Sequence, residues 1–274
     1  MTAFLSLVRK NLRDSRWMLG TMLLSLFWLS WLFVHVAHRI EKSIREATGG
    51  GPGGMRMLRG LGGAAMDFST GAIEMAFWNH PFILLIFSVW AISRGSGAIA
   101  GELERGTMDL VMSRPVSRTS FVASQLAVGL LGMVLMGLAM VLGNLAGTQY
   151  NTLESPPSVQ SLSKPAFNLL AFGWAIYGYT LLLSSGDLVR WRPTMIASIA
   201  TLAMFVALVV ASIPSLEEWK WLGKLSIFKA YNPVEAITKG EFLAFNCGIL
   251  ATIGTVGVAI GYVIFLRRDL PAGS

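Results

Sequence analysis

The chain carries the segment GELERGTMDLVMSRPVSR at residues 101–118, and this polar stretch lies between two long apolar runs. Its charged side chains are Glu102, Glu104, Arg105, Asp109, Arg114 and Arg118. The segment is compatible with a helix that ends before Pro115, because the residue before a proline is pushed away from helical backbone angles. A charged segment held between two membrane-crossing helices has to lie at one membrane face, where a soluble partner can contact it.

The composition indicates a membrane protein. Of 274 residues, 54% are hydrophobic and 14% are charged, whereas a soluble domain typically carries about 25% charged residues. The net charge of +7 comes from lysines and arginines scattered over the segments between apolar runs. They form no basic stripe, so they indicate loop charge rather than nucleic-acid binding. The single cysteine, Cys247, lies in an apolar run and excludes an internal disulfide, and no metal site is predicted.

Six apolar runs are suited to cross a bilayer as helices. The first would reach about 31 Å at 1.5 Å per residue, and it is too long for the apolar part of a cleavable signal peptide. The predicted spans are residues 17–37, 77–100, 121–147, 165–185, 193–213 and 242–266. Residues 17–274 are therefore expected to form a single all-α membrane domain of six transmembrane helices. Glycine stripes in the third and sixth runs predict close helix packing.

Two further segments are amphipathic. In residues 1–16, Leu5, Val8 and Leu12 recur at helical spacing among arginines and a lysine. This pattern predicts a helix in the membrane interface, with its basic side toward anionic lipid headgroups. The alternative is an ordinary basic flank before the first span. Residues 214–241 carry apolar side chains at every third position among charged ones, which predicts a short helix half-sunk in the interface.

An even number of spans places both chain ends on one side of the membrane. The segments on that side hold 12 Lys and Arg, against 10 on the other side, and they are shorter, so their basic density is higher. The positive-inside rule therefore places both termini and residues 101–118 in the cytoplasm. On the opposite side, the connector 38–76 contains GGGPGG at 49–54. It lacks the Gly-Lys-Ser/Thr ending of a phosphate-binding loop, so a hinge is predicted.

The pattern of residues 101–118 alone leaves two interpretations open. A rigid helix gripped by a soluble domain could transmit force to the spans, and a solvated loop could merely satisfy the topology. An intramembrane protease is disfavoured, because Glu217-Glu218 is followed by Leu222 where a Glu-Glu-x-x-x-Arg motif needs arginine.

The chain resembles the ABC-2 type transporter permeases in residues 100–110 (AGELERGTMDL) and 113–118 (SRPVSR). Members typically show A-G-E-x-E-x-G-T followed by a hydrophobic residue, then a leucine-rich stretch, then R-P-V-S-R. Val111 and Met112 replace the usual leucines, which is a mild departure. The signature covers about 20 residues, and the six-span layout with an amphipathic start extends the resemblance over the chain.

The resemblance implies that residues 1–16 are the elbow helix of the family and that residues 101–118 hold its cytoplasmic coupling helix, between spans two and three. In this family two permease subunits pair with two ATP-hydrolysing subunits. Glu102, Glu104 and Arg105 would be the polar docking contacts. The full set expected to dock the ATPase subunit is Glu102, Glu104, Arg105, Gly106, Thr107, Asp109, Arg114, Pro115 and Arg118. Arg114 and Arg118 are expected near headgroups or the acidic rim of the partner.

No Walker lysine motif is present, so ATP and Mg²⁺ are expected on a separate ATPase subunit, with no enzyme activity and no cofactor in this chain. The expected function is that of a permease subunit in a bacterial or archaeal inner membrane, paired with an identical copy or a sister permease. Few buried charges favour an apolar or amphipathic solute, and export follows by analogy with the family. The alternative is a mechanotransmitting or non-transporting scaffold that passes the ATPase cycle to an extracytoplasmic partner through residues 38–76.

Overall fold

The computed structural model describes residues 2–47, 77–113, 115–151, 156–233 and 241–269, and every regular element within these ranges is a helix. The long helices are α1 (Thr2–Ala47), α4 (Pro81–Ala98), α7 (Arg118–Tyr150), α8 (Val159–Gly186), α9 (Trp191–Ala211) and α12 (Glu241–Arg267). The short ones are α5 (Ala100–Glu104), α6 (Thr107–Met112), the 3₁₀ helix η2 (Glu217–Leu225) and α10 (Ile227–Ala230). The predicted all-α class is confirmed.

Six of these helices are long and apolar enough to cross a membrane, as predicted. The candidate spans are Ala3–Ile40, Pro81–Ala98, Arg118–Tyr150, Val159–Gly186, Trp191–Ala211 and Leu243–Arg267. Some of their limits differ from the predicted ones: the first span begins at Ala3 rather than at residue 17, and the second at Pro81 rather than at residue 77. The fourth span was expected to begin at residue 165, but the Ser158 side chain accepts a hydrogen bond from the Ser161 amide and starts α8 earlier. Pro165 then lies inside the helix.

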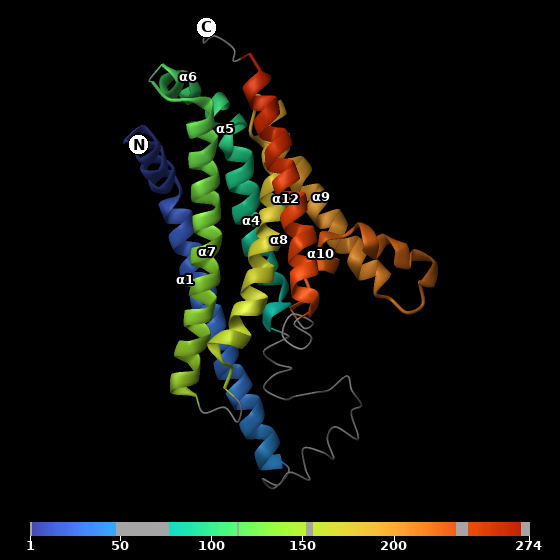
Figure 1. Ribbon diagram of the computed structural model, residues 1–274. Helices are drawn as coiled ribbons and strands as arrows, with labels where there is room; N and C mark the ends of the chain where they lie inside the picture. The colour runs from blue at the N-terminus through green and yellow to red at the C-terminus, as the bar shows by residue number, and fades with distance from the viewer. Residues whose placement is uncertain (1, 48–76, 114, 152–155, 234–240, 270–274) are drawn as a thin grey trace.

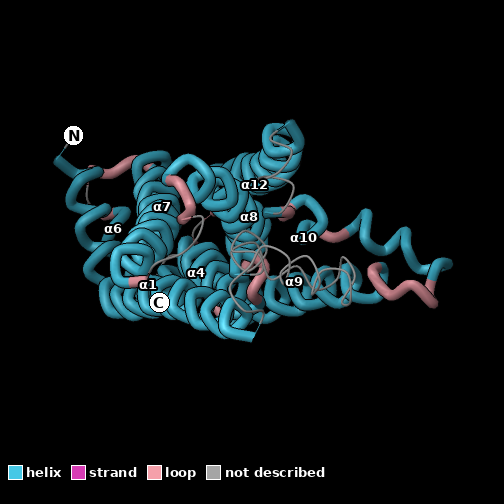
Figure 2. Tube along the Cα trace, turned by 90° about the horizontal axis from the view of Figure 1, so that it is seen from below, coloured by secondary structure: helices cyan, strands magenta, loops and turns pink. Residues whose placement is uncertain are grey.

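The helices form a bundle in which α4 lies between α7 and α8 (Figure 1). The most extensive helix pairs are α8 with α12 and α1 with α7. Helix α9 leans away from the bundle, and η2 runs back beside it. Seen from below, α9 and η2 lie on one side of the bundle, away from α1 and α7 (Figure 2). The start of α1, the end of α12 and α6 all lie at the same end of the molecule.

Glycines let the two main helix pairs approach closely, as the glycine stripes predicted. A Cβ atom added at Gly178 of α8 would collide with the backbone of Gly254 of α12. A Cβ added at Gly143 of α7 would collide with the carbonyl of Phe27 in α1. Helix association in a membrane depends on this kind of van der Waals contact between small residues, since lipid is as apolar as the helix surface.

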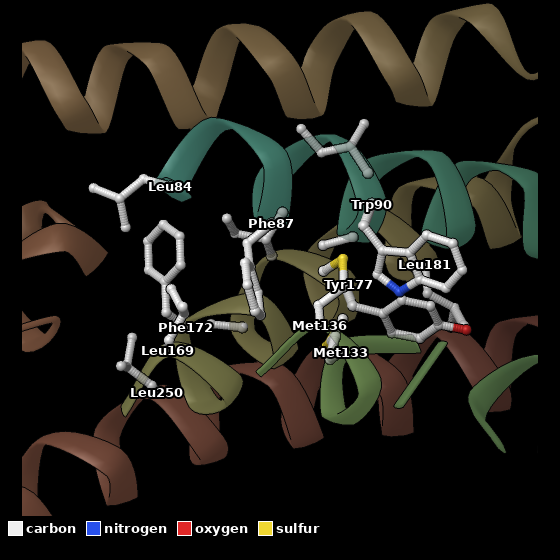
Figure 3. Packing of buried hydrophobic residues seen from close by; sticks show 14 of the residues in the cluster. Leu84, Phe87, Trp90, Met133, Met136, Leu169, Phe172, Tyr177, Leu181 and Leu250 are labelled. Atoms are coloured by element: carbon white, nitrogen blue, oxygen red, sulfur yellow. The ribbon is translucent and has the colours of Figure 1, made fainter. Parts of the chain in front are cut away.

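The core lies between α4, α7 and α8 and is rich in large side chains (Figure 3). Phe87 and Trp90 of α4 are fully buried, together with Phe172 and Tyr177 of α8. The Trp90 indole donates a hydrogen bond of 3.0 Å to the Gly129 carbonyl of α7. This contact satisfies the polar atom of a buried tryptophan and fixes α4 against α7.

Residues 2–16 form the first turns of α1 rather than a separate helix, because α1 is continuous from Thr2 to Ala47. The side facing the bundle is partly polar: Asn11 is 3% exposed and donates a hydrogen bond of 3.2 Å to the Ser124 hydroxyl of α7. Arg9, Arg13 and Arg16 are exposed, as the amphipathic pattern predicted. The interfacial position of this segment stays a prediction, and residues 48–76 of the connector lie outside the described residues.

Candidate functional site

The site begins at the break between α4 and α5. Ile99 has φ −122° and ψ −62°, which interrupts the helix. The Ser184 hydroxyl of α8, which is fully buried, accepts a hydrogen bond of 2.9 Å from the Ala100 amide and donates one of 2.9 Å to the Ser96 carbonyl. These bonds satisfy backbone groups that the interruption would otherwise leave unpaired. The direction of α5 is therefore fixed by α8.

A sharp corner follows between α5 and α6. Gly106 has φ +65° and ψ +11°, a left-handed conformation that glycine adopts readily and other residues adopt at a steric penalty. The backbone turns there, and α6 runs across the end of the bundle (Figure 1). The segment expected to form one rigid helix is thus two short helices joined at Gly106. Helix α6 ends at Met112, before Pro115, as expected from the proline.

The buried side chain of Glu102 stabilises this corner. Its side chain is 2% exposed. The carboxylate accepts hydrogen bonds from Lys10 Nζ at 2.7 Å, Thr107 Oγ1 at 2.6 Å and Arg105 Nη2 at 2.7 Å. Lys10 belongs to α1 and Thr107 to α6, so a single carboxylate joins three helices at the end of the bundle. Such charge-assisted bonds are the stronger kind found in proteins.

The electrostatics of the corner favour the ionised carboxylate. Burial alone would raise the pKa of Glu102, but hydrogen bonds from Lys10 and Thr107 and the positive charges of Lys10 and Arg105 outweigh it and hold the pKa below its usual value. Glu102 was expected to be a docking contact. That role stays a prediction, and the side chain itself offers almost no surface to another protein and is already bonded on both oxygens.

The outer surface of the corner remains free for contact. Met108 and Val111 are buried and pack α6 against the bundle, whereas Leu110 is 69% exposed. We call the corner surface the exposed set Glu104, Arg105, Gly106, Asp109, Leu110 and Pro115. The surface combines both signs of charge with one large apolar side chain. Of the other residues expected to dock the ATPase subunit, Thr107 is partly buried and bonded to Glu102. Arg114 lies outside the described residues.

Arg118 was expected near headgroups or a partner, but it closes the end of α12. Its Nη1 donates hydrogen bonds to the carbonyls of Phe265 at 3.0 Å, Leu266 at 3.0 Å and Arg268 at 2.8 Å. The last carbonyls of a helix have no partner within the helix, so a cation placed there satisfies them. Arg268 in turn donates to the carbonyls of Ser185 and Asp187 at the end of α8. Two arginines thus tie three helix ends together.

A polar chain lies beneath the corner. Arg94 Nη2 of α4 donates to Gln125 Oε1 of α7 at 2.9 Å, and the amide nitrogen of Gln125 donates to Asn11 Oδ1 of α1 at 3.4 Å. This chain links α4, α7 and α1 on the same side as the Lys10–Glu102 ion pair. The start of α1 is therefore held by two polar connections: the Lys10–Glu102 pair joins it to the corner, and this chain joins it to α7 and α4.

The sequence pattern gave no indication of Arg190, which lies between α8 and α9. Its Nη2 donates to the Ser93 carbonyl at 3.1 Å and to the Ser93 hydroxyl at 2.8 Å. Its backbone amide donates to Glu104 Oε2 at 3.2 Å. Gly101 leaves room for this side chain, since a Cβ there would lie 3.3 Å from Arg190 Cδ. Burial, followed by the charge of Arg105, lowers the pKa of Arg190.

An apolar groove of about 330 Å³ opens between α4 and α9. Among the described residues that line it, Ser88, Ser198 and Thr201 carry hydroxyl groups. The apolar lining residues are Pro81, Phe82, Leu84, Leu85, Val89, Ile92, Leu202, Phe205 and Phe228. Few residues of α9 are buried, namely Pro193, Ala197 and Thr201. The groove lies between α4 and α9, and α9 leans away from the bundle (Figure 1).

Six candidate spans with a fastened polar corner at one end define a multi-pass α-helical membrane protein. The family described as "Multidrug efflux system permease Rv1217c, C-terminal domain" matches residues 11–266. The chain belongs to this permease family. The match includes the corner and is consistent with the resemblance to ABC-2 type permeases. A comparison with curated proteins finds no match.

Proposed function

We propose that this chain is the membrane-spanning permease subunit of an ATP-driven ABC transporter that exports apolar or amphipathic solutes. Two permease subunits, identical or sister copies, form the pathway and are coupled to separate ATPase subunits that bind ATP and Mg²⁺. The word efflux in the description of the family supports export, and its multidrug description supports apolar solutes. Both termini and the corner lie in the cytoplasm in this proposal, in keeping with the positive-inside rule.

The observation that carries the proposal is the corner surface. It is exposed and lies at the end of the bundle that also holds the start of α1 and the end of α12. Charged residues around an exposed leucine provide both steering and an apolar anchor for a soluble partner. Glu102 and Ser184 hold the corner rigid against the bundle. A force applied to α6 would therefore move helices rather than bend a loop.

The transmission of force follows from these bonds. When ATP closes the partner subunits, they press on the corner surface of α6. The corner passes the movement to α1 through the Lys10–Glu102 ion pair of 2.7 Å and to α4 through α5. The Ser184 bonds carry it to α8. Helices α1, α4 and α9 then tilt against the others and change access to the solute pathway.

The pathway itself is proposed on the α4–α9 side. Helix α9 presents a row of exposed apolar side chains, including Met195, Ile199, Leu202 and Val206. A second permease subunit that packs here would place two α4–α9 grooves opposite each other. A cavity formed in this way would be lined by apolar residues and a few hydroxyls, which suits amphipathic solutes.

The test is functional reconstitution with the ATPase subunit. Leu110→Glu and Asp109→Lys should each abolish co-purification with the ATPase subunit or stimulation of its ATP hydrolysis, because they reverse the chemistry of the corner surface. Glu217→Lys is the matched control, since Glu217 is exposed on η2, far along the chain from the corner. Wild-type binding, ATPase rate and solute transport in both corner variants would contradict the proposal. Intact ATPase stimulation without solute transport in the wild type would favour the scaffold alternative.

A further inference from the structure

The residue that precedes α9, Arg190, packs over two glycines of α4 and α5. A Cβ added at Gly97 would lie 3.7 Å from Arg190 Cζ, and one added at Gly101 would lie 3.3 Å from Arg190 Cδ. The guanidinium donates to the Ser93 carbonyl at 3.1 Å and to the Ser96 hydroxyl at 3.5 Å. The glycines therefore make room for a side chain that attaches the start of α9 to α4.

The corner also contacts the first amides of α9. Glu104 Oε2 accepts a hydrogen bond of 3.2 Å from the Arg190 amide. Asp187 Oδ1 accepts from the amides of Leu188 at 2.7 Å and Val189 at 3.2 Å. Two carboxylates thus satisfy three successive amides at this helix start, where the helix dipole also favours negative charge. Because Glu104 is exposed and belongs to the corner surface, the start of α9 is bonded to that surface.

Helix α9 is bonded to the bundle again near its middle. The Thr201 hydroxyl forms a hydrogen bond with the hydroxyl of Tyr179 in α8. The buried residues of α9 are Pro193, Ala197 and Thr201, and exposed side chains such as Leu202 follow. A rigid helix that is attached near its middle and displaced at its start changes its tilt.

We propose that Arg190 is the positioning residue that transmits movement of the corner to α9, with Glu104 as its contact on the corner surface. Pressure on α6 displaces α5, and the bonds of Arg190 and Glu104 move the start of α9 with it. The helix then tilts about its contact with α8 and changes the width of the α4–α9 groove. The inference rests on the proposed function and names the residue through which the movement reaches the solute pathway.

A distance measurement on this chain alone tests the attachment of α9. Spin labels are placed at Leu85→Cys of α4 and Leu202→Cys of α9, two exposed lining residues of the groove, in a Cys247→Ala background. Pulsed electron paramagnetic resonance in lipid nanodiscs reports the distance between them. Arg190→Gln should shift this distance and broaden its distribution, because the shorter side chain no longer reaches the serines of α4. Glu104→Ala should have a smaller effect of the same kind, since it removes one bond to a backbone amide.

Reconstitution with the ATPase subunit tests the transmission itself. Arg190→Gln should lower solute transport by about tenfold, within the usual range of coupling between sites. Co-purification with the ATPase subunit and stimulation of its ATP hydrolysis should remain, because the corner surface itself is unchanged. Arg190→Lys should transport at a rate between those of the wild type and Arg190→Gln, because its ammonium keeps the charge but lacks the planar fork of donors.

Arg192→Gln is the matched control, because Arg192 lies in the first turn of α9, is exposed, and reaches Asp187 at 3.8 Å. It should keep the distance distribution and the transport rate of the wild type. Thermal unfolding of each variant checks that the fold is retained.

A wild-type distance distribution in Arg190→Gln would overturn the proposal, as would equal transport by Arg190→Gln and Arg192→Gln. A proportional loss of ATP hydrolysis and transport in Arg190→Gln would also overturn it, by indicating a purely structural role. Absence of ATPase stimulation in the wild type would instead contradict the proposed function. The distances measured without the ATPase subunit would still decide whether Arg190 and Glu104 position α9.

Discussion

At the scale of single residues, Glu102 binds three side chains at the polar end of the molecule. Its two oxygens accept from a lysine, an arginine and a threonine that belong to different parts of the chain. A buried carboxylate is stable only when such partners offset the loss of hydration. The same bonds that stabilise the charge also determine where α6 lies.

Replacing this charge should therefore loosen the corner. We expect Glu102→Gln to lower the free energy of unfolding by about 1–3 kcal/mol, because Lys10 and Arg105 lose a charged acceptor and Glu102 is buried. Thermal unfolding in detergent measures the change. Glu217→Gln removes a carboxylate from an exposed pair with Lys220 and should change stability by no more than about 0.5 kcal/mol. Equal effects of the two substitutions would contradict the role given to Glu102.

The pH dependence of stability has a defined sign. The pKa of Glu102 is lower in the folded protein than its ordinary value of 4.5. Its contribution is fully present above pH 4.5 and is lost as the pH falls below that value through the folded pKa. Unfolding temperatures measured from pH 6 down to about pH 3 should therefore fall more steeply for the wild type than for Glu102→Gln. Parallel curves for the two proteins would show that the carboxylate is not linked to folding.

At the scale of elements, the corner depends on one backbone conformation. Gly106 has φ +65°, and a Cβ added there would meet no atom within 4 Å. Any effect of Gly106→Ala therefore comes from the backbone, and we expect it to destabilise by about 1–2 kcal/mol. Gly137→Ala, in α7 and also without an atom within 4 Å of the added Cβ, should stabilise by about 0.5–1 kcal/mol instead. Chemical denaturation of both variants measures whether the signs differ.

Some elements were predictable from local sequence and others were not. The six spans follow from the length of apolar runs, and the end of α6 follows from Pro115, because both signals act within a few residues. The early start of α8 depends on capping by the Ser158 hydroxyl, and a hydropathy pattern does not reveal helix caps. The corner at Gly106 is accompanied by bonds from Thr107 to Glu102, which the local sequence does not reveal.

The roles of the site residues depend on contacts between distant parts of the chain. Lys10 reaches Glu102 across 92 positions, and Arg190 reaches Ser93 across 97. Neither contact can be predicted from the spacing or the periodicity of residues in the sequence. The docking set expected from the family signature therefore mixed two kinds of residue. Glu102 and Arg118 hold the permease together, whereas Glu104, Asp109 and Leu110 lie on the exposed corner surface.

At the scale of the whole molecule, the polar network joins helices at one end, and the apolar groove lies further along α4, between Pro81 and Ile92. The Lys10–Glu102 pair joins α1 to the corner, Ser184 joins α8 to it, and Arg190 spans from the α8–α9 connection to α4. Helix α9 is attached to the bundle mainly at this end and leans away further along. A displacement of the corner can thus change the width of the α4–α9 groove while the close α8–α12 packing is kept.

The central claim is that the corner surface faces the cytoplasm, where a separate ATPase can press on it. Cysteine labelling with a membrane-impermeant maleimide tests this most directly, in a Cys247→Ala background. Leu110→Cys reports the corner, and Tyr150→Cys, 80% exposed at the opposite end of α7, is the matched control. The account predicts that Leu110→Cys is labelled only in inside-out vesicles and Tyr150→Cys only in intact cells with a permeable outer envelope. Labelling of Leu110→Cys from outside intact cells would contradict it.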